Sequence, residues 1–142
     1  MAKNIRIYRY FIAIVPPSPF YEQANELKKY FKANYHSKAS LNSPPHITLH
    51  MPFEWRADRE ETLTDSLALF ASGQSSLEIT FNNFNRFEPR VIFIAIADDP
   101  ELTDLQHKLR MFCKKDLGLF NADYKDLPFH PHLTLAFRDL KK

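Results

Sequence analysis

Apolar residues along the chain switch between strand-like and helix-like spacing, and the segments follow one another in a regular order. β-Branched and aromatic residues fill 5–15 up to a pair of prolines, which is typical of a strand. Behind Ser18, which we expect to be a helix N-cap, apolar residues recur at helical spacing over 20–31. The segment 46–51 follows a second pair of prolines and predicts another strand.

The middle of the chain predicts a second helix and two more strands. Asp58 and Glu61 have the spacing of a capping box, and the apolar positions behind them indicate a helix that ends at Gly73. Alternating apolar residues at 77–81 and a continuous apolar run at 91–97 each predict a strand.

The last part of the chain repeats the order of helix and strand. Asp99 followed by Pro100 is a helix start signal, and Gly118 stands just past the apolar stripe of this helix. A final strand is predicted at 132–137.

This order contains an internal duplication. The tetrapeptide Phe-Ile-Ala-Ile stands at 11–14 and again at 93–96, and each copy is followed by a proline-initiated helix, a loop and a strand that begins with histidine. The histidine strands match as well, with Pro-His-Ile-Thr-Leu at 45–49 and Pro-His-Leu-Thr-Leu at 131–135. Shared order and shared motif together indicate a true repeat.

The repeat predicts the organisation of the molecule. A chain of 142 residues fits one domain, which we expect to cover 1–142. Within it, two lobes of about 1–75 and 76–142 are expected to be related by a pseudo-twofold axis, and strand exchange between them is compatible with the pattern.

The doubled H-x-T motif is the candidate for chemistry. Residues i and i+2 of a strand point to the same face, so His46 lies beside Thr48, and His132 lies beside Thr134. Lobes related by a twofold axis bring these two faces to one cleft. One histidine in a strand is more often structural, but two copies at equivalent points of a repeat favour a functional role.

Two facing imidazoles suit an in-line displacement at phosphorus. An ordinary histidine pKa of about 6.5 populates both the neutral base and the protonated acid near neutrality. One ring takes a proton from the attacking water or hydroxyl, and the other donates a proton to the departing ribose oxygen. Threonine hydroxyls can hold charge on the non-bridging phosphate oxygens.

Composition excludes several other kinds of site. With only two glycines, Gly73 and Gly118, the chain has no dinucleotide fingerprint, P-loop or G-x-S-x-G elbow. The net charge of +2 is too small for tight non-specific duplex binding. One cysteine cannot form an internal disulfide, and no apolar run approaches the ~18 residues of a membrane span. We therefore expect a cytoplasmic protein without a membrane partner.

Further histidines raise the question of a metal. His130 and His132 have the spacing of two ligands on one strand face, and His46 with His50 offers two more. Acidic residues and cysteines are absent from both motifs, so we expect no metal and no cofactor. His50 and His130 are expected to flank the site or to orient its partners, and Cys113 is expected to be a buried, inert thiol.

The motifs resemble those of the two-histidine (2H) phosphoesterases, and the bacterial 2′-5′ RNA ligase and cyclic phosphodiesterase group is the most similar branch. Residues 9–14 also resemble the opening strand of that family, and 87–93 with the helix around 102–106 resemble its middle section. The likeness spans 9–138 and includes both motifs.

The resemblance implies a bilobal α+β fold of mostly antiparallel sheets, with outer helices and a cleft between the lobes. It also implies ATP-independent hydrolysis of RNA 2′,3′-cyclic phosphates, or ligation to 2′-5′ linkages. By this likeness His46 and His132 are the acid–base pair, and Thr48 and Thr134 bind the phosphate. RNA termini or nucleotides with a 2′,3′-cyclic phosphate are then the partners.

Three other residues are candidate substrate contacts: Arg138, His130 and Phe11. Arg138 continues the face of the second motif by strand parity. Four further aromatic residues are expected in the core, although each has a face that can stack on a base: Phe53, Trp55, Phe84 and Phe87.

Two alternative functions stay open. One is a non-catalytic module that binds an RNA end or a nucleotide, and the other is a cyclic phosphodiesterase for a small ADP-ribose cyclic phosphate. The 2H family also continues past its second motif with strands that are not found in this sequence, which ends at Lys142. We expect a monomer, with association through an incomplete C-terminal sheet edge as the alternative.

Overall fold

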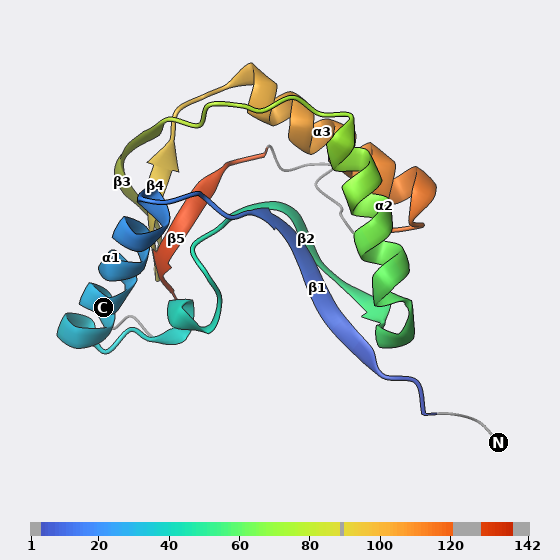
Figure 1. Cartoon of the computed structure of the whole chain (residues 1–142). Coiled ribbons are helices and arrows are strands. Elements are labelled where there is room, and N and C mark those ends of the chain that lie inside the picture. Colours follow the sequence, from blue (N-terminus) through green and yellow to red (C-terminus); the bar gives the residue numbers. More distant parts are fainter. Residues whose placement is uncertain (1–3, 89, 121–128, 138–142) are drawn as a thin grey trace. The chain divides into compact units, whose positions relative to one another are not determined.

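Five strands form one sheet in the computed structural model, which describes residues 4–88, 90–120 and 129–137 (Figure 1). The strands are β1 (Ile7–Ile14), β2 (Ile47–Arg56), β3 (Phe81–Phe87), β4 (Val91–Ile96) and β5 (His132–Ala136). Their order in the sheet is β1-β2-β5-β4-β3. The pairs β2–β5, β5–β4 and β4–β3 are antiparallel, which confirms the predicted α+β class with an antiparallel sheet.

Three α-helices and two 3₁₀ turns occur in the same described ranges. They are α1 (Phe20–Tyr35), α2 (Glu60–Ser72), α3 (Pro100–Asp116), η1 (Ala39–Asn42) and η2 (Ala57–Arg59). None of these helices is long and apolar enough to cross a lipid bilayer.

The chain divides into two compact units, each built from separate stretches of sequence. Unit 1 consists of Met1–Ile12, Leu49–Glu78 and Asp99–Phe129, and unit 2 consists of Ala13–Thr48, Ile79–Asp98 and His130–Lys142. Both units draw on both halves of the repeat, so the compact units do not follow the halves 1–75 and 76–142. Unit 2 contains α1, β3, β4 and β5, and α1 packs against β5 (Figure 1).

Helix starts were predicted with mixed success. Asp99 caps α3 as expected, because its carboxylate accepts a hydrogen bond from the Glu101 N–H at 2.9 Å. The capping box at Asp58 is wrong, because the Asp58 carboxylate accepts from the Arg56 guanidinium at 2.8 Å and α2 begins only at Glu60. Ser18 is also one residue off, since Pro19 is the N-cap of α1.

The strand predicted at 77–81 is displaced toward the C-terminus. The observed strand β3 starts at Phe81 and reaches Phe87, through a stretch with four polar residues. It pairs with the apolar strand β4, with Phe81 opposite Ile96 and Phe87 opposite Val91. The position of this strand is therefore determined by hydrogen bonding to its buried neighbour β4. The alternation of apolar residues in its own sequence does not determine it.

Alternate residues of β2 and β5 fill the core of unit 2. Ile47 is 1% exposed, and Leu133 and Leu135 are fully buried. Ala24 on α1 is also fully buried. Interiors of this kind are close-packed, so removing a side chain leaves a cavity that the surroundings fill only in part.

We predict that Leu133→Ala lowers the free energy of unfolding by about 2–5 kcal/mol. The matched control is Leu69→Ala, since Leu69 is 73% exposed and its loss should change stability by no more than about 0.5 kcal/mol. Urea unfolding followed by circular dichroism measures both values. Equal effects of the two substitutions would contradict the assignment of the core.

Candidate active site

The two H-x-T motifs lie on neighbouring strands. Strands β2 and β5 run antiparallel, and Ile47 of the first motif stands opposite Leu133 of the second. These two residues occupy equivalent positions of the sequence repeat, between the histidine and the threonine of each motif. The two copies of the motif are therefore paired with each other at equivalent residues, as a local twofold relation requires.

The polar residues of both motifs share the other face of this strand pair. Extending the observed register by one residue places His46 opposite Thr134 and His132 opposite Thr48. Directly opposed residues have Cβ atoms about 4.5–5.5 Å apart, and diagonal neighbours such as the two histidines about 7–8 Å apart. All four side chains are half-buried. The register thus makes the two histidines diagonal neighbours on one face of the strand pair.

The candidate site is contained in one compact unit. His46, Thr48, His132 and Thr134 all belong to unit 2. Pairing between β2 and β5 joins the two motifs directly within this unit.

Both histidines are held by the same backbone contact. The Nδ1 atom of His46 lies 2.7 Å from the Pro44 carbonyl oxygen, and Nδ1 of His132 lies 2.7 Å from the His130 carbonyl oxygen. A carbonyl only accepts, so Nδ1 carries the proton on each ring and Nε2 becomes the atom for proton transfer.

A proline explains why this contact recurs. In both motifs a proline separates the histidine from the carbonyl that its ring contacts, Pro45 in the first and Pro131 in the second. Proline fixes its own φ and restricts the backbone of the residue before it. The carbonyl two residues before the histidine is thereby held in one orientation.

The surroundings of both imidazoles disfavour the protonated form. Burial lowers the pKa of His46, and the positive charge of Lys28 lowers it further, against the opposing hydrogen bond to Pro44. Burial also lowers the pKa of His132, and His130 and His46 add repulsion. The two imidazoles thus interact electrostatically, and protonation of one disfavours protonation of the other. A singly protonated pair is the state that supplies one acid and one base.

A buried lysine anchors the loop that leads into the first motif. Lys28 on α1 is 1% exposed, and its Nζ donates to the carbonyl oxygens of Ser40 at 2.8 Å and Ser43 at 3.0 Å. The Ser40 hydroxyl donates to the Leu135 carbonyl oxygen at 2.7 Å. This network connects α1 to the loop before His46 and to β5. Burial lowers the pKa of Lys28 to about 8.

Sequence analysis missed Lys28 because the helix was read from its apolar residues alone. Position 28 lies four residues after Ala24 and three before Phe31, on the stripe that faces inward. A lysine on the apolar stripe of a helix is a signal for a buried, hydrogen-bonded amine.

The other predicted substrate contacts have different outcomes. His130 is exposed, and its ring lies 6.3 Å from that of His132. Phe11 is 43% exposed and belongs to unit 1. Arg138 lies outside the described residues. His50, expected to flank the site or to orient its partners, is fully buried in unit 1, with its ring 5.4 Å from that of Phe53.

The part of the chain that the structure describes offers neither a cluster of metal ligands nor a reactive thiol. No group of three or more His, Cys, Asp or Glu side chains there is arranged to hold a metal ion. Cys113 is fully buried as expected, and burial raises its pKa to about 11, which keeps the thiol protonated.

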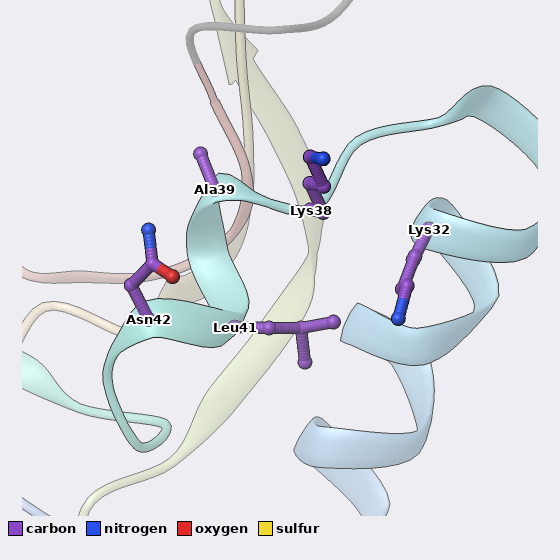
Figure 2. A pocket seen from close by; sticks show the side chains of 5 residues that line it. All are labelled: Lys32, Lys38, Ala39, Leu41 and Asn42. Carbon is purple, nitrogen blue, oxygen red and sulfur yellow. The ribbon is translucent and has the colours of Figure 1, made fainter.

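A cavity of about 450 Å³ lies beside η1 in unit 2 (Figure 2). Its lining residues are Lys32 from α1 and four residues around η1, namely Lys38, Ala39, Leu41 and Asn42. None of the H-x-T residues lines it, so this cavity is distinct from the histidine pair.

The electrostatic coupling of the histidines predicts a measurable change. Replacing His46 by Gln removes a positive charge near His132, so the pKa of His132 should rise toward its ordinary value. Histidine ring signals followed by NMR against pH measure this pKa. His107→Gln, at an exposed position of α3, is the control and should leave it unchanged. An unchanged His132 pKa in His46→Gln would show that the rings do not interact.

The buried amine of Lys28 predicts a pH dependence of the free energy of unfolding. Between pH 8 and the ordinary value of 10.5 the unfolded state keeps the Lys28 proton that the folded state has released. Stability attributable to this group therefore rises with pH across that window. In Lys28→Met the rise should be missing when the free energy of unfolding is measured from pH 7 to 10.5. The exposed Lys29→Met is the control, and parallel curves for wild type and Lys28→Met would contradict the account.

Comparison with known proteins identifies the family of the chain. A family model described as the 2′-5′ RNA ligase superfamily matches residues 16–142. A relative from Oceanobacillus iheyensis, named "Putative phosphoesterase", is 36% identical over 133 residues, which cover 90% of this chain and 69% of the relative. A relative from Bacillus cereus strain B4264, whose name is also "Putative phosphoesterase", is 29% identical over 127 residues. These residues cover 88% of this chain and 67% of the relative.

A solved structure shares the fold. The crystal structure of E. coli LigT complexed with NADP+ matches with a TM-score of 0.55 and 22% sequence identity, over 97% of this chain and 74% of that one. At this identity the likeness concerns the fold alone. The family model covers nearly the whole chain, and the chain therefore belongs to the 2′-5′ RNA ligase superfamily, as its paired H-x-T motifs indicate.

Proposed function

We propose that the protein is a phosphodiesterase that opens 2′,3′-cyclic phosphates at RNA ends or on nucleotides, with His46 and His132 as its acid–base pair. The observation that carries the proposal is the shared face of β2 and β5, where two imidazoles held by matched Nδ1 contacts stand beside two threonines. Family membership and the phosphoesterase names of the relatives support phosphate ester chemistry.

The proposed step needs one proton acceptor and one proton donor. The neutral Nε2 of one histidine takes a proton from water, and the water oxygen forms a new bond to phosphorus. The bond from phosphorus to one ribose oxygen breaks, and the second, protonated imidazole gives its proton to that oxygen. The product is a phosphomonoester with a free neighbouring hydroxyl, and the catalytic pair ends with its single proton on the other ring.

The threonines have a separate role. Thr48 and Thr134 lie on the same face as the histidines and carry hydroxyls that can donate to the non-bridging oxygens. Charge on these oxygens must be held through the displacement, and fixed donors in a partly buried site do this well. Because both motifs lack acidic residues, which would be metal ligands, we propose that the step proceeds without a metal ion.

Ligation is the same ring opening with a different nucleophile. An RNA 5′-hydroxyl in place of water, attacking the cyclic phosphate, gives a phosphodiester with one 2′ or 3′ linkage. The same base and acid serve this reaction, and the family description includes a 2′-5′ RNA ligase. Hydrolysis is the direction proposed here, since the relatives are named as phosphoesterases.

The pKa shifts favour turnover over simple binding. A module that only grips phosphate is served best by permanently charged side chains such as arginine. Burial lowers the pKa of both His46 and His132, which makes them weaker anion ligands and raises the fraction of the neutral form, the form that accepts a proton. A small ADP-ribose cyclic phosphate would use the same groups, and substrate comparison separates it from RNA ends.

The test is hydrolysis of mono- and oligonucleotide 2′,3′-cyclic phosphates in the presence of a chelator. Each of His46→Ala and His132→Ala should lower kcat by about 10²–10⁴ with little change in KM. The double variant should lose far less than the product of the single losses, because the two groups act in one step. Thr48→Val and Thr134→Val should each lose about 0.5–1.5 kcal/mol of transition-state stabilisation.

His107→Ala, at an exposed site on α3, is the control for loss of a histidine as such. Wild-type activity that disappears in chelator and returns with a divalent metal would refute the metal-free step. Full activity in both single histidine variants would refute the assigned pair.

A further inference from the structure

An aromatic side chain stands on the same sheet face as the H-x-T residues. In the β4–β5 ladder Phe93 is opposite Thr134, and in the β3–β4 ladder Asn85 is opposite Phe93. Opposed residues share a face, and residues two apart in a strand do as well. Phe87, two residues after Asn85 at the end of β3, therefore lies on the face of the candidate site.

Three rings fix the orientation of Phe87. It stacks on Phe93, with ring centroids 4.3 Å apart and planes at 29°. It makes T-shaped contacts with the rings of His132 and His130, with centroids 5.1 Å away in both cases. Phe93 is 1% exposed, whereas Phe87 is 37% exposed. The stack thus covers Phe93 and leaves part of Phe87 open beside His132.

Two features separate this ring from an ordinary exposed phenylalanine. Singly exposed apolar side chains are normal on protein surfaces. Phe87, however, contacts one of the two H-x-T histidines and packs against three rings in all, which hold its open surface in a defined orientation. Phe84 on the same strand is more exposed, at 61%, but it is opposite Ile94 and so points to the other face.

We propose that Phe87 is a stacking platform for the nucleobase of the cyclic phosphate substrate. This inference rests on the proposed function, and it names the ligand class of the site: cyclic phosphates that carry a base. The base is one ribose away from the phosphate, and a phosphate at His132 puts it within reach of a ring 5.1 Å from that imidazole. Stacking uses the π-face that every base has, so the site should accept all four bases.

Kinetics with two substrates test the platform. One is adenosine 2′,3′-cyclic phosphate, and the other is methyl ribofuranoside 2′,3′-cyclic phosphate, which has the same reacting group and no base. In Phe87→Leu, kcat/KM for the nucleotide should fall about 5- to 100-fold, mainly through KM. The loss for the base-free substrate should be several-fold smaller. Phe87→Trp should restore the nucleotide preference.

Phe84→Leu is the matched control and should leave the nucleotide preference at its wild-type value. Equal losses on the two substrates in Phe87→Leu would overturn the platform and assign Phe87 to the positioning of His132. No loss on either substrate would overturn it as well.

A binding measurement separates this inference from the proposed function. If wild-type protein hydrolyses neither substrate, the proposed function fails. Titration with adenosine 2′-monophosphate and with inorganic phosphate, followed by NMR, then still tests whether a base stacks on Phe87. Tighter binding of the nucleotide that is lost in Phe87→Leu supports it, and equal affinity of both variants for the nucleotide overturns it.

Discussion

The antiparallel pairing of β2 with β5, with Ile47 opposite Leu133, is the constraint on which the candidate site depends. Because side chains alternate along a strand, a slip of one residue would turn the motif histidines of one strand into the core. Burial of Ile47, Leu133 and Leu135 opposes that slip, since their apolar surface would then be exposed. The core side of the strand pair thus sets the geometry of its polar side.

The same burial that fixes the register also tunes the chemistry. Half-buried imidazoles lose solvation of their charged form, so the pKa of each lies below its ordinary value. Lys28 strengthens this effect at His46, and its ammonium simultaneously holds the carbonyl oxygens of the loop that leads into the motif. The position and the proton affinity of His46 therefore have a common structural origin on α1.

Local rules predicted much of this arrangement. Strand parity and the repeat were sufficient to place each histidine beside its threonine, and the start signal at Asp99 was correct because it depends on neighbouring residues alone. Features decided by distant partners were missed. The strand predicted at 77–81 shifts to pair with β4. The capping box at Asp58 failed for a local reason instead, because Arg56, two residues away, engages the Asp58 carboxylate. Phe87, expected in the core, is 37% exposed on the edge strand β3.

The pH dependence of kcat/KM for a 2′,3′-cyclic nucleotide tests the paired histidines most directly. Both imidazoles have a lowered pKa, so the free protein should give a bell-shaped profile centred below about pH 6.5. Each of His46→Ala and His132→Ala should remove one limb of the bell, measured on the residual activity. Two limbs that survive in both variants would show that other groups carry the protons and would contradict the account.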